Sequence, residues 1–359
     1  MNIKKILPLA FASMLLFNVS CSSDNDYIEV IEKPQSGLYE NGIIVSNEGG
    51  FTKPTSDVTF ISNNLGKVYT NIYSSNNGGE VFGKVLQSVG FSGDKAYLVA
   101  NVPNKIDIVN RYTFKKQTTV TVNLDGPRYI AFSGNKYFVT NNNFAGQQKL
   151  NAYNVADNVY FGSMGFPRYA EKVVAAEGNI IVQTDGIGYE TTPPYNSYAT
   201  GYTITVVNPA TMINPTTITL PAKGIIRDLI AYNGIAYVLV SDTTDSYIYK
   251  INSAAGNYTT TTLAGIADAQ KLRADQNNFY FITGSNNIYS MTIGSSFVSK
   301  VPLVKASGNV YGFDVIDGRI FASDASFTED SKVNIYSALD GTLLKTFTAG
   351  IGTNGFYKN

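Results

Sequence analysis

The chain of 359 residues contains no histidine and a single cysteine, Cys21. Catalysis by Ser-His-Asp or Cys-His groups, zinc sites built from His and Cys, and histidine-ligated haem are therefore excluded. One cysteine cannot form an internal disulfide, so a folded domain of an exported chain would depend on its core alone. With 44% hydrophobic and 13% aromatic residues, the chain has the material for a substantial core.

Charged residues are few and balanced, with 27 basic and 27 acidic side chains. Removal of the first twenty residues takes away Lys4 and Lys5 and leaves 25 basic residues, a net charge of about −2. Such a surface exerts no long-range attraction on phosphate backbones, so nucleic acid is not an expected partner.

Two patterns resemble binding motifs but lack a required part. The segment 78–84, Gly-Gly-Glu-Val-Phe-Gly-Lys, matches the start of a phosphate-binding loop, but Val85 replaces the Ser or Thr that binds Mg²⁺ and strand-like sequence follows. A chance match in a glycine-rich connection is the better interpretation. The acidic segments 242–245 and 324–330 lack EF-hand spacing, which favours solvated loops and leaves calcium binding as the alternative. No metal ligand and no cofactor are predicted.

The N-terminus has the pattern of a targeting signal. Lys4 and Lys5 precede an apolar run over residues 6–17, which is too short to span a bilayer and fits the core of a signal peptide. Cys21 stands at the expected cleavage point. We therefore expect residues 1–20 to be a lipoprotein signal peptide and Cys21 to be the lipidated first residue of the mature protein. A simple secretory peptide with an incidental cysteine is the alternative, and Asn18 stands where leucine is usually favoured.

The polar residues 21–38 suit a flexible tether, and residues 39–359 are expected to form the domain. The acidic stretch 22–26, Ser-Ser-Asp-Asn-Asp, resembles the surface-export signal of Bacteroidetes lipoproteins. The expected location is the outer membrane, lipid-anchored and exposed at the cell surface.

From Tyr39 onward the sequence consists of short runs rich in Val, Ile, Thr, Tyr and Phe, interrupted by turn pairs. Such pairs lie at residues 41–42, 93–94, 134–135, 178–179, 233–234, 277–278 and 317–318. They recur roughly every 40 to 55 residues, the size of a four-stranded propeller blade. No window shows a convincing helical period of apolar residues. The sequence therefore predicts an all-β, seven-bladed β-propeller.

The two chain ends complement each other. The first unit has its later strands, including one expected over 68–73, but lacks a complete innermost strand, and residues 352–359 resemble that missing strand. If the C-terminal strand completes the first blade, the ring has no open sheet edge. We therefore predict closure by pairing of the chain end with the chain start.

Three segments carry a family resemblance. The run 42–50 (Gly-Ile-Ile-Val-Ser-Asn-Glu-Gly-Gly), the corner 126–129 (Gly-Pro-Arg-Tyr) and the ending 354–357 (Asn-Gly-Phe-Tyr) resemble the YncE-like propeller lipoproteins of Bacteroidetes, a domain of unknown function family, DUF5074. The resemblance covers about residues 39–359. Some members bind cobalamin at the cell surface and pass it to a TonB-dependent transporter, so the resemblance implies a receptor role. The ligand-contacting residues of those members cannot be matched to individual positions of this sequence.

In such a blade, the innermost strand starts on the face that also carries the loop between the second and third strands, a face where propellers commonly bind ligands. Counting back six residues from each turn predicts seven positions around the axis: Gln87, Arg128, Lys172, Asp228, Lys271, Gly312 and Asn354. Arg227 and Tyr311 are their immediate neighbours. One interpretation is a recognition floor for a polar or anionic group. The alternative is that these side chains tie neighbouring blades together.

One loop above this floor is long. Residues 185–202 contain two adjacent prolines and four tyrosines, among them Tyr189, Tyr195 and Tyr198. The aromatic rings give a large amphipathic surface at low conformational cost, suited to a flat ligand or to a protein. Packing over the rim of the fold is the alternative role of these rings and of Phe327.

The leading hypothesis is a lipid-anchored surface protein that captures a nutrient, with a cobalamin-like molecule as one option, for a TonB-dependent outer-membrane transporter. A second hypothesis is a protein-interaction scaffold without a small ligand. An enzyme comes third, because without histidine it would depend on pairs such as Asp228 with Lys172 or Lys271. We expect a binding protein and not an enzyme.

Overall fold

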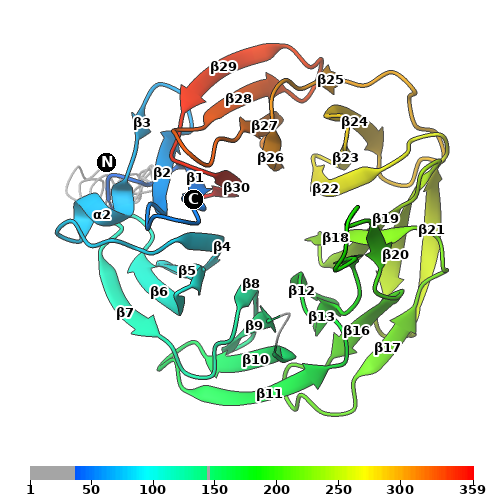
Figure 1. The fold of residues 1–359 in the computed structure, drawn as a ribbon, viewed down its shortest axis with the longest axis horizontal. Helices are drawn as coiled ribbons and strands as arrows, with labels where there is room; N and C mark the ends of the chain where they lie inside the picture. The colour runs from blue at the N-terminus through cyan, green and yellow to red at the C-terminus, as the bar shows by residue number, and fades with distance from the viewer. Residues whose placement is uncertain (1–36, 144–145) are drawn as a thin grey trace, which may run out of the picture. The chain divides into compact units, whose positions relative to one another are not determined.

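The computed structural model describes residues 37–143 and 146–359. The predicted signal peptide, Cys21 and the predicted tether up to residue 36 lie outside the described residues. Residues Gly37–Asn359 form one compact unit. In it, seven four-stranded antiparallel sheets surround a central axis (Figure 1). This is the predicted seven-bladed propeller.

Each blade runs from an innermost strand at the axis to an outermost strand at the rim. In that order, blade one contains β30 (Thr353–Lys358), β1 (Gly42–Asn47), β2 (Asp57–Ser62) and β3 (Val68–Tyr69). Blade two contains β4 (Val85–Ser92), β5 (Lys95–Val102), β6 (Asn104–Asn110) and β7 (Lys116–Val120). Blade three contains β8 (Pro127–Ser133), β9 (Lys136–Asn142), β10 (Gln148–Asn154) and β11 (Tyr160–Phe166). Blade four contains β12 (Val173–Ala176), β13 (Asn179–Gln183), β16 (Thr203–Val207) and β17 (Thr216–Thr219).

Blades five to seven follow the same order. Blade five contains β18 (Ile225–Tyr232), β19 (Ile235–Ser241), β20 (Ser246–Asn252) and β21 (Asn257–Leu263). Blade six contains β22 (Ala269–Asp275), β23 (Asn278–Thr283), β24 (Asn287–Thr292) and β25 (Val304–Lys305). Blade seven contains β26 (Val310–Ile316), β27 (Arg319–Asp324), β28 (Lys332–Ser337) and β29 (Leu343–Thr348). A separate hairpin of β14 (Ile187–Tyr189) and β15 (Ser197–Ala199) interrupts blade four.

Tight turns join the innermost strand of a blade to the second strand. Asn233 and Gly234 have φ angles of 49° and 73°, and Asp317 and Gly318 have φ angles of 52° and 72°. Two successive residues with positive φ form the hairpin turn that matches the twist of the flanking strands, and Asn, Asp and Gly adopt it most readily. The predicted turns at 233–234 and 317–318 are therefore confirmed.

The outermost strand of blade one differs from the prediction. The strand expected over 68–73 ends at Tyr69, and a short helix, α2 (Ile72–Asn76), follows. The carboxylate of Asp57 accepts hydrogen bonds from the backbone N–H groups of Tyr73 and Ser74, at 2.9 and 3.2 Å. It thereby satisfies donors at the helix N-terminus that have no partner within the helix. The glycine-rich segment 78–84 then leads into strand β4, and not into the helix that a phosphate-binding loop requires.

The core of this unit lies between the blades. Seven clusters of buried apolar side chains occur among the described residues, and each joins two neighbouring blades. The cluster between blades seven and one contains Phe321 and Phe356, whose ring centroids lie 5.5 Å apart. Each blade therefore depends on both of its neighbours for burial of its faces.

The C-terminal strand closes the ring, as predicted. β30 pairs antiparallel with β1, and Val45 lies opposite Phe356. The last residue is held at both ends of its side chain, since Arg111 Nε donates to Asn359 Oδ1 at 2.6 Å and Asn359 Nδ2 donates to the carbonyl of Tyr39. In Figure 1, β30 lies next to the axis and β1 beside it.

No helix in the described part of the chain is both long enough and apolar enough to cross a membrane.

Candidate functional site

The innermost strands begin irregularly. The pairing with the second strand shifts register at Leu86/Ser88 in blade two, at Ile226/Asp228 in blade five and at Ala269/Lys271 in blade six, and similar shifts occur in blades one, three and seven. Such bulges leave one residue unpaired and redirect its side chain. Except for Lys172 in blade four, whose inner strand pairs without a register shift, the residues predicted to start the strands lie at or beside these bulges.

We call the polar side chains around the axis at this level the polar ring. They are Glu48, Gln87, Arg128, Glu171, Lys172, Asp228, Lys271, Arg273, Tyr311, Asp314 and Asn354. The structure thus brings together all the predicted strand starts that have a polar side chain. Gly312, the seventh, contributes a backbone N–H that donates to Ser323 Oγ at 2.6 Å.

Blades two, three and four are linked through Arg128. Its guanidinium donates to Gln87 Oε1 at 2.5 Å and to the carboxylate of Glu171 at 2.7–3.0 Å. Asn142 Nδ2 donates to the same carboxylate at 3.2 Å. These charge-assisted bonds join three consecutive blades.

Blades four to seven are linked through Asp228 and Arg273. Asp228 is 2% exposed, and its Oδ2 accepts from Arg273 at 2.8 Å, while Lys172 Nζ lies 3.8 Å from its Oδ1. Arg273 also donates to Asp314 Oδ2 at 2.9 Å. The ammonium of Lys172 lies 3.7 Å from the ring centroid of Tyr129 in blade three. One carboxylate therefore neutralises cations from both sides.

Blades six, seven, one and two complete the circuit. Lys271 Nζ donates to the backbone carbonyl of Tyr311, whose hydroxyl donates to Glu48 Oε2 at 2.6 Å. Asn354 Nδ2 donates to the carbonyl of Leu86 at 2.9 Å. Polar contacts thus connect each blade with the next around the whole axis. These contacts agree with the interpretation that the polar side chains tie neighbouring blades together. A ligand would have to bind to those donor and acceptor atoms of the polar ring that these contacts do not use.

Burial changes the acid–base behaviour of three ring members. Burial, with repulsion from Arg273 and Lys172, lowers the pKa of Lys271 to about 7. Burial raises the pKa of Glu48 and that of Asp314 above the usual range for a carboxyl group. The part of the ring around Lys271 therefore gains and loses protons more readily than an exposed surface would near neutral pH.

Arg227 does not join the polar ring. Its Nε donates to Ser241 Oγ at 3.0 Å, and its NH2 lies 3.1 Å from Asp268 Oδ1, which is half-buried. It therefore links the entrances of the inner strands of blades five and six.

Asp185 anchors the base of the long loop. The side chain is fully buried and accepts hydrogen bonds from Arg168 at 2.6 and 2.7 Å, from Thr200 at 3.1 Å, and from the N–H and hydroxyl of Thr203 at 2.9 and 2.6 Å. Burial alone would raise the pKa of Asp185, but these bonds hold it below its usual value. A Cβ on Gly201 would lie 2.4 Å from the carboxylate, so only glycine leaves room for it.

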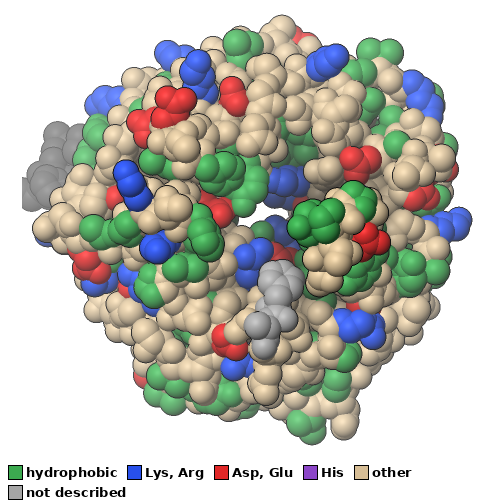
Figure 2. All heavy atoms as spheres, in the orientation of Figure 1, with side chains coloured by type: hydrophobic (Ala, Val, Ile, Leu, Met, Phe, Trp, Pro, Cys, Tyr) green, Lys and Arg blue, Asp and Glu red, His purple; other side chains and the backbone are tan. Residues whose placement is uncertain are grey.

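Above this anchor, hairpin β14–β15 carries the predicted tyrosines. Tyr189, Tyr195 and Tyr198 are 61%, 58% and 52% exposed, and both hairpin strands contact β18 of blade five. Figure 2 shows hydrophobic side chains gathered beside the central opening on this side, with Lys and Arg side chains at the edge of the opening. The hairpin thus presents an aromatic surface to solvent.

Two further aromatic side chains lie across the axis. Phe51, in the loop between β1 and β2, is 75% exposed, and Phe327, in the loop between β27 and β28, is 43% exposed. The Phe327 ring packs edge-on against Tyr311, with centroids 5.3 Å apart. Since blade four lies opposite blades seven and one in the ring, exposed aromatic groups flank the opening on two sides.

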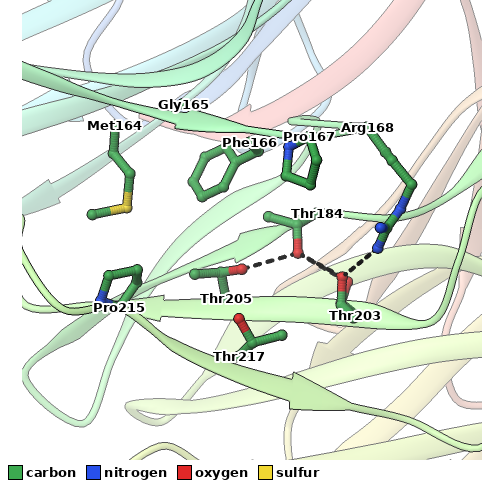
Figure 3. Close-up of a pocket in the computed structure, with 10 residues that line it drawn as sticks. All are labelled: Met164, Gly165, Phe166, Pro167, Arg168, Thr184, Thr203, Thr205, Pro215 and Thr217. Carbon is green, nitrogen blue, oxygen red and sulfur yellow. Dashed lines mark hydrogen bonds between the residues drawn. The ribbon is translucent and has the colours of Figure 1, made fainter.

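A groove of about 380 Å³ lies away from the axis, between blades three and four (Figure 3). Met164, Phe166 and Pro215 form its apolar walls, and Thr184, Thr203, Thr205 and Thr217 line its floor. Thr184 bonds to both Thr203 and Thr205, at 3.1 and 3.0 Å, so these hydroxyls already satisfy one another.

The acidic segments suggested as solvated loops have local partners. Asp242 Oδ1 accepts from the N–H groups of Thr244 and Asp245, at 2.7 and 2.8 Å, which orders the turn. Over residues 37–143 and 146–359, no group of three or more acidic, Cys or His side chains is arranged to hold a metal ion.

Sequence reasoning missed Glu48, Glu171, Arg273 and Asp314. Arg273 follows Lys271 by two positions and Asp314 follows Gly312 by two, the spacing that keeps side chains on one face of a strand. That periodicity could have identified both. Glu171 lies just before strand β12 and Glu48 just after strand β1, outside the strands, where strand periodicity gives no guidance.

The comparisons with known proteins agree with this architecture. The chain matches the sequence model of a family described as "Domain of unknown function (DUF5074)" over residues 41–354. No curated protein matches it. Among solved structures, it is similar to the dihydro-heme d1 dehydrogenase NirN in complex with DHE (12% identity, TM-score 0.55, 90% of this chain and 76% of that chain covered). It is also similar to BamB from Moraxella catarrhalis (13% identity, TM-score 0.53, 89% of this chain and 86% of that chain covered). A third similar structure is the computationally designed Ika8 protein (11% identity, TM-score 0.55, 89% of this chain and 91% of that chain covered). At such identities these similarities concern the fold alone.

Proposed function

The chain belongs to the family described as Domain of unknown function (DUF5074), and we propose that it is a binding protein which captures a nutrient at the mouth of its central channel. The observation that carries this proposal is the aromatic mouth. We use this name for five exposed rings on loops of blades one and seven and on the β14–β15 hairpin of blade four: Phe51, Tyr189, Tyr195, Tyr198 and Phe327. Aromatic groups around a concave, polar-floored opening suit a large ligand with planar parts.

The proposal places the protein at the cell surface, held by a lipid on Cys21 and serving a TonB-dependent outer-membrane transporter. A cobalamin-like molecule is one option for the ligand, through the resemblance noted in the sequence. We propose no catalytic step. The oxygens of Asp228 accept from Arg273 and from the N–H groups of Leu229 and Leu272, which leaves this carboxylate poorly placed to act as a base.

The test is direct binding of cobalamin and related corrinoids to the full-length protein, measured by calorimetry. The double variant Tyr195→Ala, Tyr198→Ala should bind at least about tenfold more weakly, because two stacking surfaces are lost. Phe297→Ala is the matched control. Phe297 is 75% exposed but lies in the loop between β24 and β25, on the opposite face. Unchanged affinity in the tyrosine variant would contradict capture at the aromatic mouth.

A second candidate is a protein-interaction scaffold. Exposed apolar side chains also occur on the loops of the opposite face, where Leu339 is 90% and Ile213 is 61% exposed. The Leu339→Ser, Ile213→Ser variant separates the two functions. If this variant no longer binds a purified TonB-dependent transporter but still binds the ligand, the opposite face is the docking surface. If the Tyr195→Ala, Tyr198→Ala variant fails to bind the transporter in the absence of ligand, the aromatic mouth itself is a protein-binding site.

A further inference from the structure

Lys271 differs from the other cations of the polar ring in its partners. Arg128, Lys172 and Arg273 each lie within 4 Å of a carboxylate. Among the described residues, Lys271 has no carboxylate at that distance, and the carbonyl of Tyr311 is the one acceptor of its ammonium. An ammonium has three N–H groups, so two remain for a ligand.

Within the described part of the chain, Lys271 makes no direct ion pair with the charges around it. Lys172, Lys271 and Arg273 supply three positive charges, while Asp228 and Asp314 supply two negative charges. Glu48 supplies a third negative charge that acts on Lys271, but its carboxylate bonds to the neutral donors Tyr311 and Asn354. Lys271 is therefore the cation of this group whose ammonium has no carboxylate of the described residues in direct contact, and burial makes such an unpaired charge costly.

The site can be reached from the channel. Lys271 is partly exposed, and the side chains of Lys172 and Arg273 are 24% and 20% exposed. Basic side chains appear at the edge of the central opening in Figure 2. The Lys271 ammonium also lies 5.2 Å from the ring centroid of Tyr311, against which Phe327 of the aromatic mouth packs. The Lys271 ammonium is therefore connected to the aromatic mouth through the ring of Tyr311.

We infer that Lys271, in the positive field of Lys172 and Arg273, binds an anionic group, a carboxylate or a phosphate, of the captured ligand. The inference rests on the proposed function, because it assumes that the planar part of the same ligand lies against the aromatic mouth. A carboxylate or phosphate at Lys271 gives its ammonium the direct anionic partner that the polar ring does not supply, and it accepts the two remaining N–H groups. The ligand class is thus a molecule that combines a planar or apolar body with one acidic group.

The experiment titrates inorganic phosphate and, separately, acetate into the full-length protein by calorimetry at constant ionic strength. Phosphate, acetate or both should bind saturably at one site, and the stronger of the two identifies the acidic group. Lys271→Met should weaken this binding at least tenfold. Lys305→Met is the matched control, since Lys305 is an exposed lysine on the outer strand of the same blade, and it should leave binding unchanged. Lys271→Arg keeps the charge and should retain much of the affinity, which shows that the site persists in a folded variant.

The pH dependence adds an independent readout. Acetate keeps its charge between about pH 6 and about pH 8, so its affinity should fall over that interval as Lys271 loses its proton. Lack of saturable binding by both anions, or equal binding by wild type and Lys271→Met, would overturn the inference. The Tyr195→Ala, Tyr198→Ala variant should bind both small anions normally, so failure of the anion site and failure of the aromatic mouth are distinguishable.

Discussion

The guanidinium of Arg128 in blade three holds both carboxylate oxygens of Glu171 in blade four, at 2.7–3.0 Å and across 43 positions of sequence. The two side chains are 23% and 12% exposed. Removal of one partner from such a pair leaves an unpaired charge in a poorly hydrated place. We therefore expect Arg128→Met to lower the free energy of unfolding by about 3–5 kcal/mol, measured by urea denaturation.

The double variant Arg128→Met, Glu171→Gln is the control for this prediction. Without a charge left unpaired, it should recover a large part of the loss. Equal stability of the single variant and the wild type would show that the pair is not a structural tie between blades three and four.

Closure of the ring gives a second prediction. Phe356 in β30 is 2% exposed and packs in the cluster between blades seven and one. Phe356→Ala should lower the free energy of unfolding by about 3–5 kcal/mol, the usual range for loss of a buried phenylalanine. Deletion of residues 352–359 should lower the melting temperature far more, because β1 loses its inner partner. A truncated chain with an unchanged melting temperature would be incompatible with closure by β30.

The anchor of the tyrosine hairpin gives a third prediction. Asp185→Asn replaces a carboxylate with an amide that cannot accept the same bonds from Arg168 and Thr203. Residues 186–201 should then exchange backbone amide protons about tenfold faster or more, while β18 stays protected. Slow exchange throughout this segment would mean that the hairpin is held by its other contacts. Because the folded pKa of Asp185 lies below that of the unfolded chain, its contribution to stability is present above about pH 4 and is lost as the pH falls through the folded pKa.

Lys271 gives a prediction with a defined sign. Its pKa falls from 10.5 in the unfolded chain to about 7 in the fold, so the folded state binds fewer protons between these values. Stability of the wild type should therefore rise with pH across this window, and the cost of the buried ammonium is complete below pH 7. Lys271→Met removes that cost. Its stability relative to wild type should be higher at about pH 6 than at about pH 9, by on the order of 1–2 kcal/mol after allowance for partial exposure. Parallel stability curves for the two proteins over this range would contradict the lowered pKa.

Much of the fold could be predicted because its signals are local. A pair such as Asn233-Gly234 needs no distant partner to form its turn, and the spacing of such pairs sets the blade length. The closing strand could be predicted because a ring cannot leave an inner edge unpaired. Helix α2 could not be predicted from local signals, because the carboxylate that accepts hydrogen bonds from its first N–H groups belongs to Asp57, in a preceding strand.

The site was predictable in position but not in pairing. Counting from the turns placed Arg128, Lys172, Asp228 and Lys271 around one axis, which the structure confirms. Which charge meets which depends on bulges such as the one between Ala269 and Lys271, and these redirect side chains without a local sequence signal. Arg227, next to Asp228 in sequence, consequently bonds to Asp268, just before the inner strand of blade six, and not to the polar ring.

The pairing of β1 with β30 has a consequence for biosynthesis. Gly350 donates its N–H to Asn47, 303 positions earlier, so blade one stays incomplete until strand β30 has been made. Until then the nascent protein carries an unprotected β1 edge, which favours its retention by chaperones. A premature stop before β30 should therefore yield a product prone to self-association and degradation.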